Sequence, residues 1–217
     1  MTSGCGVDSV DEYFDPPRSD GHMVYCTTAD RTQHYFGFYT TEVNTSTEVV
    51  FLGTEVYYKI YSNASSVDSV LASVEATSEN SQATYLTGSR GYKSLRLLAD
   101  STPYPIIKAS GSNRHVEIRL SDYSSYQKQV SVNSSSIGIP VRNTVSGGFN
   151  FKSGDSANPL PVSGDSDSSL SKFTVAGTYY VDMYAVSIGR NTADGTTYYS
   201  KVLHLGAVPI ATPWTLN

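Results

Sequence analysis

Residues 49–63, VVFLGTEVYYKIYSN, constrain the fold of this chain more than any other stretch. Val56, Tyr58 and Ile60 occupy alternate positions, and Lys59 falls between two of them. A period of two is that of a β-strand, whose successive side chains point to opposite faces. Val, Ile and Tyr are also residues that strands favour. The stretch therefore predicts one long strand, covered well on one face and partly on the other, in the middle of an all-β domain.

Many shorter runs with strand character accompany this long one. They are separated by clusters of Ser, Thr, Asn and Gly, which favour turns. These runs cover residues 22–28, 34–43, 82–86, 93–98, 104–108, 115–120, 129–132, 138–141 and 148–151. Short strands at spacings of about 8–12 residues are typical of a β-sandwich or a β-barrel.

The C-terminal part predicts a long hairpin. Residues 177–186, GTYYVDMYAV, and residues 198–205, YYSKVLHL, both alternate, and an Asp-Gly turn signal lies between them. Gly-Thr followed by tyrosine, valine and alanine resembles the penultimate strand of fibronectin type III and other immunoglobulin-like sandwiches. In that family the tyrosine usually stands one residue further along than Tyr179; Tyr180 matches this spacing but would turn Asp182 inward. The expected fold is an all-β, immunoglobulin-like antiparallel β-sandwich.

One stretch departs from the strand period. In residues 65–77, SSVDSVLASVEAT, the apolar residues from Val67 to Val74 follow the spacing i, i+3, i+4, i+7 of an amphipathic helix. Ser65, with Asp68 three residues later, resembles a capping box. The sequence thus predicts one short helix, packed across one end of the β-structure.

The chain is expected to form one domain behind an N-terminal tether. Residues 8–17, DSVDEYFDPP, are acidic, end in two prolines and show no core pattern. We therefore expect residues 1–20 to be a tether and residues 21–217 to be a single β-sandwich domain. Residues 154–169, GDSANPLPVSGDSDSS, predict a long loop within this domain, because too few strands follow to form a second one.

Composition excludes several classes of partner. Charged residues make up 16% of the chain, against about 25% in typical soluble domains, while 17 residues are tyrosine. This profile suits an extracytoplasmic β-protein. The formal net charge is −5, and Lys and Arg are scattered singly, so we expect no binding of nucleic acids or other polyanions. No run approaches the ~18 consecutive apolar residues of a membrane helix.

The sequence contains no catalytic motif, so we expect no catalytic residues and no cofactor. The four histidines, His22, His34, His115 and His204, are far apart, and no pair has the spacing of metal ligands. A Gly-x-Ser-x-Gly elbow, which would place a nucleophilic serine, does not occur. We therefore expect a protein that is not an enzyme.

Three aspartates in the loop at residues 154–169 are the only group with oxygen ligands suited to a hard cation. They are Asp155, Asp165 and Asp167. An EF-hand loop needs more carboxylates at fixed intervals and a terminal Glu. We therefore favour a solvated loop and predict no metal site, with cation binding at this loop as the alternative.

The paired tyrosines allow two interpretations. In a pair such as Tyr57-Tyr58 one ring must face each side of its strand, so half of these rings are expected to be exposed. They could stabilise the sheet as cross-strand pairs, which we favour. Alternatively, exposed rings could form a platform for a protein or glycan partner, since tyrosine offers area and a hydroxyl. The candidates for this platform are Tyr57, Tyr61, Tyr180, Tyr184 and Trp214.

The N-terminus carries a short targeting-like motif. Residues 2–5, Thr-Ser-Gly-Cys, resemble the end of a bacterial lipobox, in which the cysteine is acylated and becomes the mature N-terminus. That family has a hydrophobic segment before the cysteine, whereas only Met1 precedes these residues here. We nevertheless expect lipidation of Cys5, because the acidic tether that follows is what a lipid-anchored domain needs. The alternative is a disulfide between Cys5 and Cys26, worth roughly 3 kcal/mol in a loop-entropy account.

The first third of the chain resembles a group of spirochaetal (Treponema-type) lipoproteins of unknown function. The resemblance rests on CGVD at residues 5–8, YFDPP at 13–17, QHYFGF at 33–38 and FLGTEVYYKIY at 51–61. It implies a lipid-anchored location in the bacterial cell envelope, facing the periplasm or the cell surface, with Cys5 as the acylation site. It implies no activity.

These observations favour a non-enzymatic envelope lipoprotein that acts as a binding, adhesion or assembly module. The alternative is a viral or phage structural protein, such as a fibre or capsid-associated sandwich, which the richness in Ser, Thr and Tyr also fits.

Overall fold

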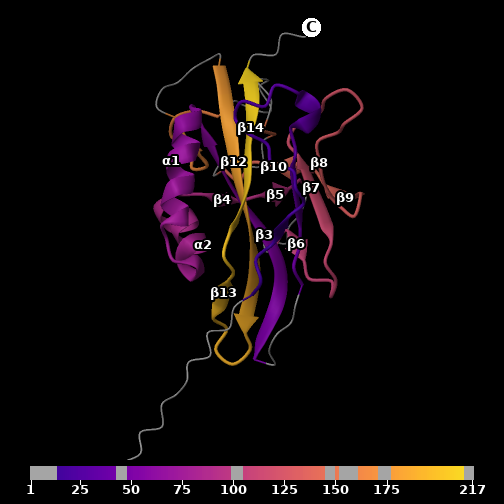
Figure 1. Ribbon diagram of the computed structural model, residues 1–217, viewed down its shortest axis with the longest axis vertical. Helices are drawn as coiled ribbons and strands as arrows, with labels where there is room; N and C mark the ends of the chain where they lie inside the picture. The colour runs from indigo at the N-terminus through magenta and orange to yellow at the C-terminus, as the bar shows by residue number, and fades with distance from the viewer. Residues whose placement is uncertain are drawn as a thin grey trace, which may run out of the picture.

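Two stacked β-sheets, with helices on the outer face of one of them, make up this all-β protein (Figure 1). The computed structural model describes residues 14–42, 48–98, 105–144, 150–151, 161–170 and 177–212. Cys5, Trp214 and Asp155 lie outside these residues. The predicted β-sandwich is confirmed, and its strands are antiparallel apart from one parallel edge.

The larger sheet is built around the long strand that the sequence predicts. β3 (Val49–Tyr61) pairs along its length with β12 (Gly177–Asn191), and β12 pairs in turn with β14 (Leu203–Thr212) and β13 (Thr197–Tyr199). Short strands extend β3 on its other edge: β4 (Lys93–Ser94), β6 (Ile107–Lys108) and the parallel β11 (Ser168–Ser169). The predicted C-terminal hairpin is therefore confirmed, and β3 and β12 form the centre of the sheet.

The second sheet has the order β1-β2-β7-β8-β9. Its strands are β1 (Arg18–Ser19), β2 (Phe36–Tyr39), β7 (His115–Arg119), β8 (Gln129–Val132) and β9 (Ser135–Gly138). A separate pair joins β5 (Arg96–Leu97) to β10 (Pro140–Val141). In the predicted strand at residues 115–120, Val116, Ile118 and Leu120 are buried, and Arg119, expected to point outward, is buried as well.

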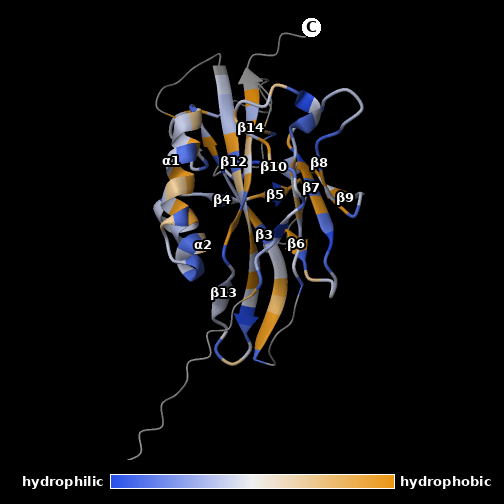
Figure 2. Cartoon of the chain, viewed as in Figure 1, coloured by the Kyte–Doolittle hydropathy of each residue, from blue (hydrophilic) through white to orange (hydrophobic). Residues whose placement is uncertain are grey.

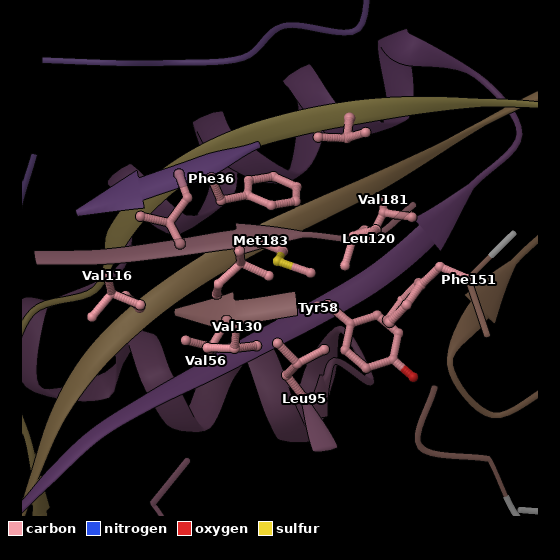
Figure 3. Packing of buried hydrophobic residues seen from close by; sticks show 14 of the residues in the cluster. Phe36, Val56, Tyr58, Leu95, Val116, Leu120, Val130, Phe151, Val181 and Met183 are labelled. Atoms are coloured by element: carbon pink, nitrogen blue, oxygen red, sulfur yellow. The ribbon is translucent and has the colours of Figure 1, made fainter. Parts of the chain in front are cut away.

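The main core fills the space between the sheets. Figure 3 shows side chains from the larger sheet, among them Tyr58, Val181 and Met183, close to Phe36 and Val116 of the second sheet. Apolar residues run along β3, β7 and β8 (Figure 2), as the period of two requires. Burial of this apolar surface is the main stabilising contribution to the fold.

A helical layer covers the outer face of the larger sheet (Figure 1). α1 (Ala64–Glu75) confirms the predicted helix and buries Val67, Val70 and Val74 against the sheet. Its N-cap is Asn63, whose side chain accepts the Ser66 N–H at 2.8 Å, and not the predicted Ser65. A 3₁₀ turn, η1 (Arg31–Gln33), lies elsewhere, before β2. In the described ranges no helix is long and apolar enough to cross a membrane.

Residues 82–86, predicted as a strand, are helical. The chain runs from η2 (Glu79–Ser81) through α2 (Gln82–Thr84) into the π-helical turn η3 (Tyr85–Ser89). The Gln82 side chain donates to the carbonyl of Val74 at 3.1 Å and accepts the N–H of Val202 at 3.2 Å. These long-range bonds tie the segment to α1 and to the residues before β14, which a local pattern does not reveal.

The N-terminal tether ends earlier than the predicted residue 20. Phe14 is buried, and its ring lies 5.8 Å from that of Phe51. Gly189 makes room for it, because a Cβ there would lie 1.9 Å from the Phe14 ring. β1 then pairs with β2. Residues from Phe14 onward therefore belong to the folded domain.

Candidate functional site

An apolar pocket of about 200 Å³ lies between residues 23–27, the first turns of α1 and the start of β14. Its walls include Val24, Val67, Leu71 and Ala207, and Met23 and Tyr25, which are 38% and 61% exposed, line it as well. The other lining residues are Cys26, Thr27, Ala64, Asp68, His204 and Gly206. A mostly apolar concavity with a few polar groups is the usual form of a small-molecule site.

A close backbone contact between Val24 and Gly206 holds residues 23–27, one wall of the pocket, in place. Residues 22–28, predicted as a strand, form only an isolated bridge between Val24 and Gly206. The N–H of Ala207 donates to the carbonyl of Val24 at 2.9 Å. Gly206 has φ of +100°, and a Cβ on it would lie 2.1 Å from the Val24 oxygen. Only glycine fits this approach.

We expect Gly206→Ala to lower the free energy of unfolding by about 3 kcal/mol. Left-handed strain of about 1–2 kcal/mol adds to an overlap of about 1–3 kcal/mol that displaces residues 23–27. Gly195→Ala is the matched control, since Gly195 also has positive φ, +76°, but no atom within 4 Å of its Cβ position. Urea unfolding measures both. Equal losses for the two variants would show that the contact with Val24 contributes nothing.

A chain of hydrogen-bonded side chains leads from His204, which lines the pocket, into the protein interior. His204 Nε2 lies 2.7 Å from Asp182 Oδ1, and the Tyr92 hydroxyl donates to Asp182 Oδ2. The Tyr61 hydroxyl donates in turn to the Tyr92 oxygen at 3.3 Å. Asp182 is fully buried, and this burial raises its pKa although the bonds from His204 and Tyr92 favour the charged form. Burial thus favours the protonated form of Asp182, while His204 and Tyr92 favour the carboxylate.

His204 connects this buried chain to the pocket. Its ring packs against Tyr184, with centroids 4.7 Å apart, and its side chain keeps 14% of its surface exposed. Nε2 is used by Asp182, while Nδ1 makes no hydrogen bond to any residue that the structure describes. Because the Asp182 carboxylate fixes the ring, Nδ1 is a positioned polar group available to a ligand.

Cys26 and His204 both line this pocket, with Asp182 buried behind the histidine, but the three residues do not form an activated nucleophile. Burial and the nearby Asp182 charge raise the pKa of the free Cys26 thiol to about 11. A reactive cysteine needs a lowered pKa, which neighbouring positive charge provides. Among the described residues no hydrogen bond joins the thiol to His204. The arrangement therefore suits binding better than thiol chemistry.

The structure places most of the candidate tyrosines away from solvent. Tyr57, Tyr61 and Tyr184 are buried, so the prediction that they are exposed is wrong. The reason is the helical layer, because these rings lie on the outer face of the larger sheet and α1 and Tyr92 cover them. Tyr180 is half-buried at the same layer. Tyr184 nevertheless contacts His204, and Tyr61 donates to Tyr92.

The aspartates of the polar loop bind an arginine. Arg142 Nη2 lies 2.7 Å from Asp167 Oδ1 and 2.6 Å from Asp165 Oδ2. Tyr58 donates to Asp167 Oδ2 at 2.7 Å. The guanidinium therefore neutralises both carboxylates, while cation binding at this loop stays an alternative. Across the described ranges, no group of three or more His, Cys, Asp or Glu could hold a metal ion.

The remaining histidines take part in local structure. His22 stacks on Tyr35 with centroids 3.8 Å apart, and His34 Nε2 lies 2.8 Å from the carbonyl of Thr28. His115 Nε2 lies 2.9 Å from Asp20 Oδ2. Sequence analysis missed His204 as a site residue, and it also missed Asp182, which the alternation of β12 places on the face opposite to Val181 and Met183.

No protein family, no curated protein and no solved structure matches this chain.

Proposed function

We propose that this protein is a non-enzymatic binding module of a bacterial cell envelope, held at a membrane by a lipid on Cys5. Its ligand site is the apolar pocket in front of His204. The observation that carries the binding role is the pocket itself, with apolar walls, the exposed Met23 and Tyr25 in its lining, and one fixed imidazole. The envelope location rests on the lipobox resemblance.

The pocket selects a ligand by size and polarity. A space of about 200 Å³ suits a small, mostly apolar molecule or one end of a larger one. A polar group on that molecule can hydrogen-bond to His204 Nδ1, which Asp182 keeps in place. A ligand that leaves this nitrogen unpaired loses about 1 kcal/mol for the missing hydrogen bond. The site therefore favours amphipathic molecules over fully apolar ones.

Binding is tested with 4-fluorophenol as the probe, observed by ¹⁹F NMR. We expect saturable binding that is about fivefold weaker for fluorobenzene, which lacks the hydroxyl. Ala64→Phe fills the pocket from the first turn of α1 and abolishes binding. Ala72→Phe is the matched control, because Ala72 is exposed on the same helix and does not line the pocket. Equal binding by both variants would place the probe elsewhere and refute this site.

Anchoring is tested with the gene expressed from its native upstream sequence. We expect the wild-type protein and Cys26→Ala in the membrane fraction, with the mass of acyl chains on a chain that starts at Cys5. Cys5→Ala is expected in the soluble fraction. A wild-type chain that is unmodified and soluble would contradict the lipoprotein proposal and favour the viral or phage structural alternative.

A further inference from the structure

A second hollow, of about 320 Å³, lies on the opposite flank of α1 from the apolar pocket and has polar walls. Lys59 at the end of β3 and Arg90 after η3 face it. Serine side chains from several elements complete the lining, among them Ser66 of α1, Ser89 of η3 and Ser169 of β11. The site thus collects donors from four separate segments of the chain.

The two cations of this hollow have no acidic partner among the residues that the structure describes. Lys93 lies outside this lining but close enough for its charge to act on Lys59. Burial and the charges of Lys93 and Arg90 lower the pKa of Lys59. Asp167 is close enough to oppose this, but Arg142 already neutralises it. In a chain of net charge −5, this is a local excess of positive charge.

The cations are also held in position. Lys59 Nζ donates to the carbonyl of Arg90. Arg90 Nε donates to the Tyr85 hydroxyl at 2.7 Å, and its Nη2 donates to Ser73 Oγ at 2.9 Å. An ammonium and a guanidinium each keep further N–H donors after these bonds. The cations therefore offer charge and donors without having to reorganise.

The arrangement of the donors selects the shape of the anion. Lys59, Arg90 and the hydroxyls of Ser89 and Ser169 come from three segments of the chain, and these two hydroxyls make no hydrogen bond within the described ranges. Several donors suit an anion with several acceptor oxygens, such as a tetrahedral oxyanion. A carboxylate offers only two oxygens to such a set of donors. Asn63 already caps α1, so the site relies on side chains and not on the helix terminus.

We propose that this hollow binds the phosphate group of a small molecule or of a lipid headgroup through Lys59 and Arg90. The site is separate from the apolar pocket, and its ligand need not be the same one. Lys59 contributes a point charge, while Arg90 contributes a planar set of donors suited to phosphate oxygens.

The test is a titration of ¹⁵N-labelled protein with inorganic phosphate, against sodium chloride of equal ionic strength. We expect saturable shifts at Lys59, Ser66, Arg90 and Ser169 that chloride does not produce. Lys59→Met is expected to raise the dissociation constant for phosphate about tenfold or more. Lys59→Arg, which keeps the positive charge, should retain most of the wild-type affinity. Lys108→Met is the matched control for net charge, since Lys108 is exposed and lies outside the hollow.

A second arm distinguishes the sources of the phosphate. Vesicles of phosphatidylcholine with phosphatidic acid are compared with inorganic phosphate, using wild type and Lys59→Met. Tighter, Lys59-dependent binding to the vesicles assigns a lipid headgroup, and its absence assigns a soluble phosphate compound. Phosphate shifts that are absent, or that fall elsewhere, overturn the proposal. If Lys59→Met does not fold, the wild-type map alone decides.

Discussion

Replacing Arg142 with methionine is expected to lower the free energy of unfolding by about 3–5 kcal/mol. The side chain is fully buried, and it donates to Asp167 from both Nε, at 2.9 Å, and Nη2, at 2.7 Å. Asp167 is itself fully buried. Without the guanidinium, the Tyr58 hydroxyl is the one side-chain donor that its carboxylate keeps among the residues that the structure describes. A buried charge that loses its counterion costs far more than an exposed one.

Urea unfolding of a double-mutant cycle measures this effect. Arg142→Met combined with Asp167→Asn should recover part of the loss, because no uncompensated charge then remains buried. The control is Lys128→Met, which removes an exposed ion pair with Asp122 and should cost less than about 1 kcal/mol. A loss for Arg142→Met as small as that of the control would show that the ion pair does not stabilise the fold.

Stability is expected to fall as the pH rises from about 5 to 8, and Glu55 is the main cause. Glu55 is fully buried in β3, and burial raises its pKa well above the usual value, although the N–H groups of Val56 and Ile106 favour the charged form. Above about pH 4.3 the unfolded chain loses this proton while the folded chain keeps it. The free energy of unfolding then decreases by up to ~1.4 kcal/mol per pH unit.

The measurement is urea unfolding at several pH values for wild type and Glu55→Gln. The variant should lose most of the slope, because its amide does not titrate. Asp182 has a raised pKa as well and contributes a smaller slope of the same sign. Glu42, with a lowered pKa, destabilises the fold only as the pH falls through its folded pKa, outside this window. An identical slope in Glu55→Gln would contradict this assignment.

The sequence predicts the elements whose pattern is local and long. β3 and the hairpin of β12 and β14 alternate over many residues, so their period identifies them and their burial follows. α1 is predicted for the same reason, from apolar residues at helical spacing. Such patterns predict the all-β sandwich, while the expectation of an immunoglobulin-like arrangement stays a prediction.

The sites depend on contacts between residues that are distant in the sequence. The pocket exists because residues 23–27 pack on Gly206, and the hydrogen bonds behind it join Tyr92, Asp182 and His204. No periodicity indicates which of these segments become neighbours. The tyrosines illustrate the same point. Alternation predicts the face of the strand on which Tyr57 lies, but it does not predict that a helical layer covers this face.

The loop at residues 154–169 illustrates how a polar pattern is misread. Its composition indicates exposure, yet Asp167 is fully buried. The reason is Arg142, which lies more than twenty residues away and neutralises Asp165 and Asp167 together. A charged residue is buried when it has a partner, and a single sequence does not identify that partner.

A map of 4-fluorophenol binding on the ¹⁵N-labelled protein tests whether the apolar pocket is the ligand site. We predict saturable amide shifts confined to residues 23–27, the first turns of α1 and residues 204–207, the segments that surround the pocket. These shifts should be absent in Ala64→Phe and present in Ala72→Phe. Shifts scattered over the surface, or an unchanged map in Ala64→Phe, would contradict the assignment of this pocket as the ligand site.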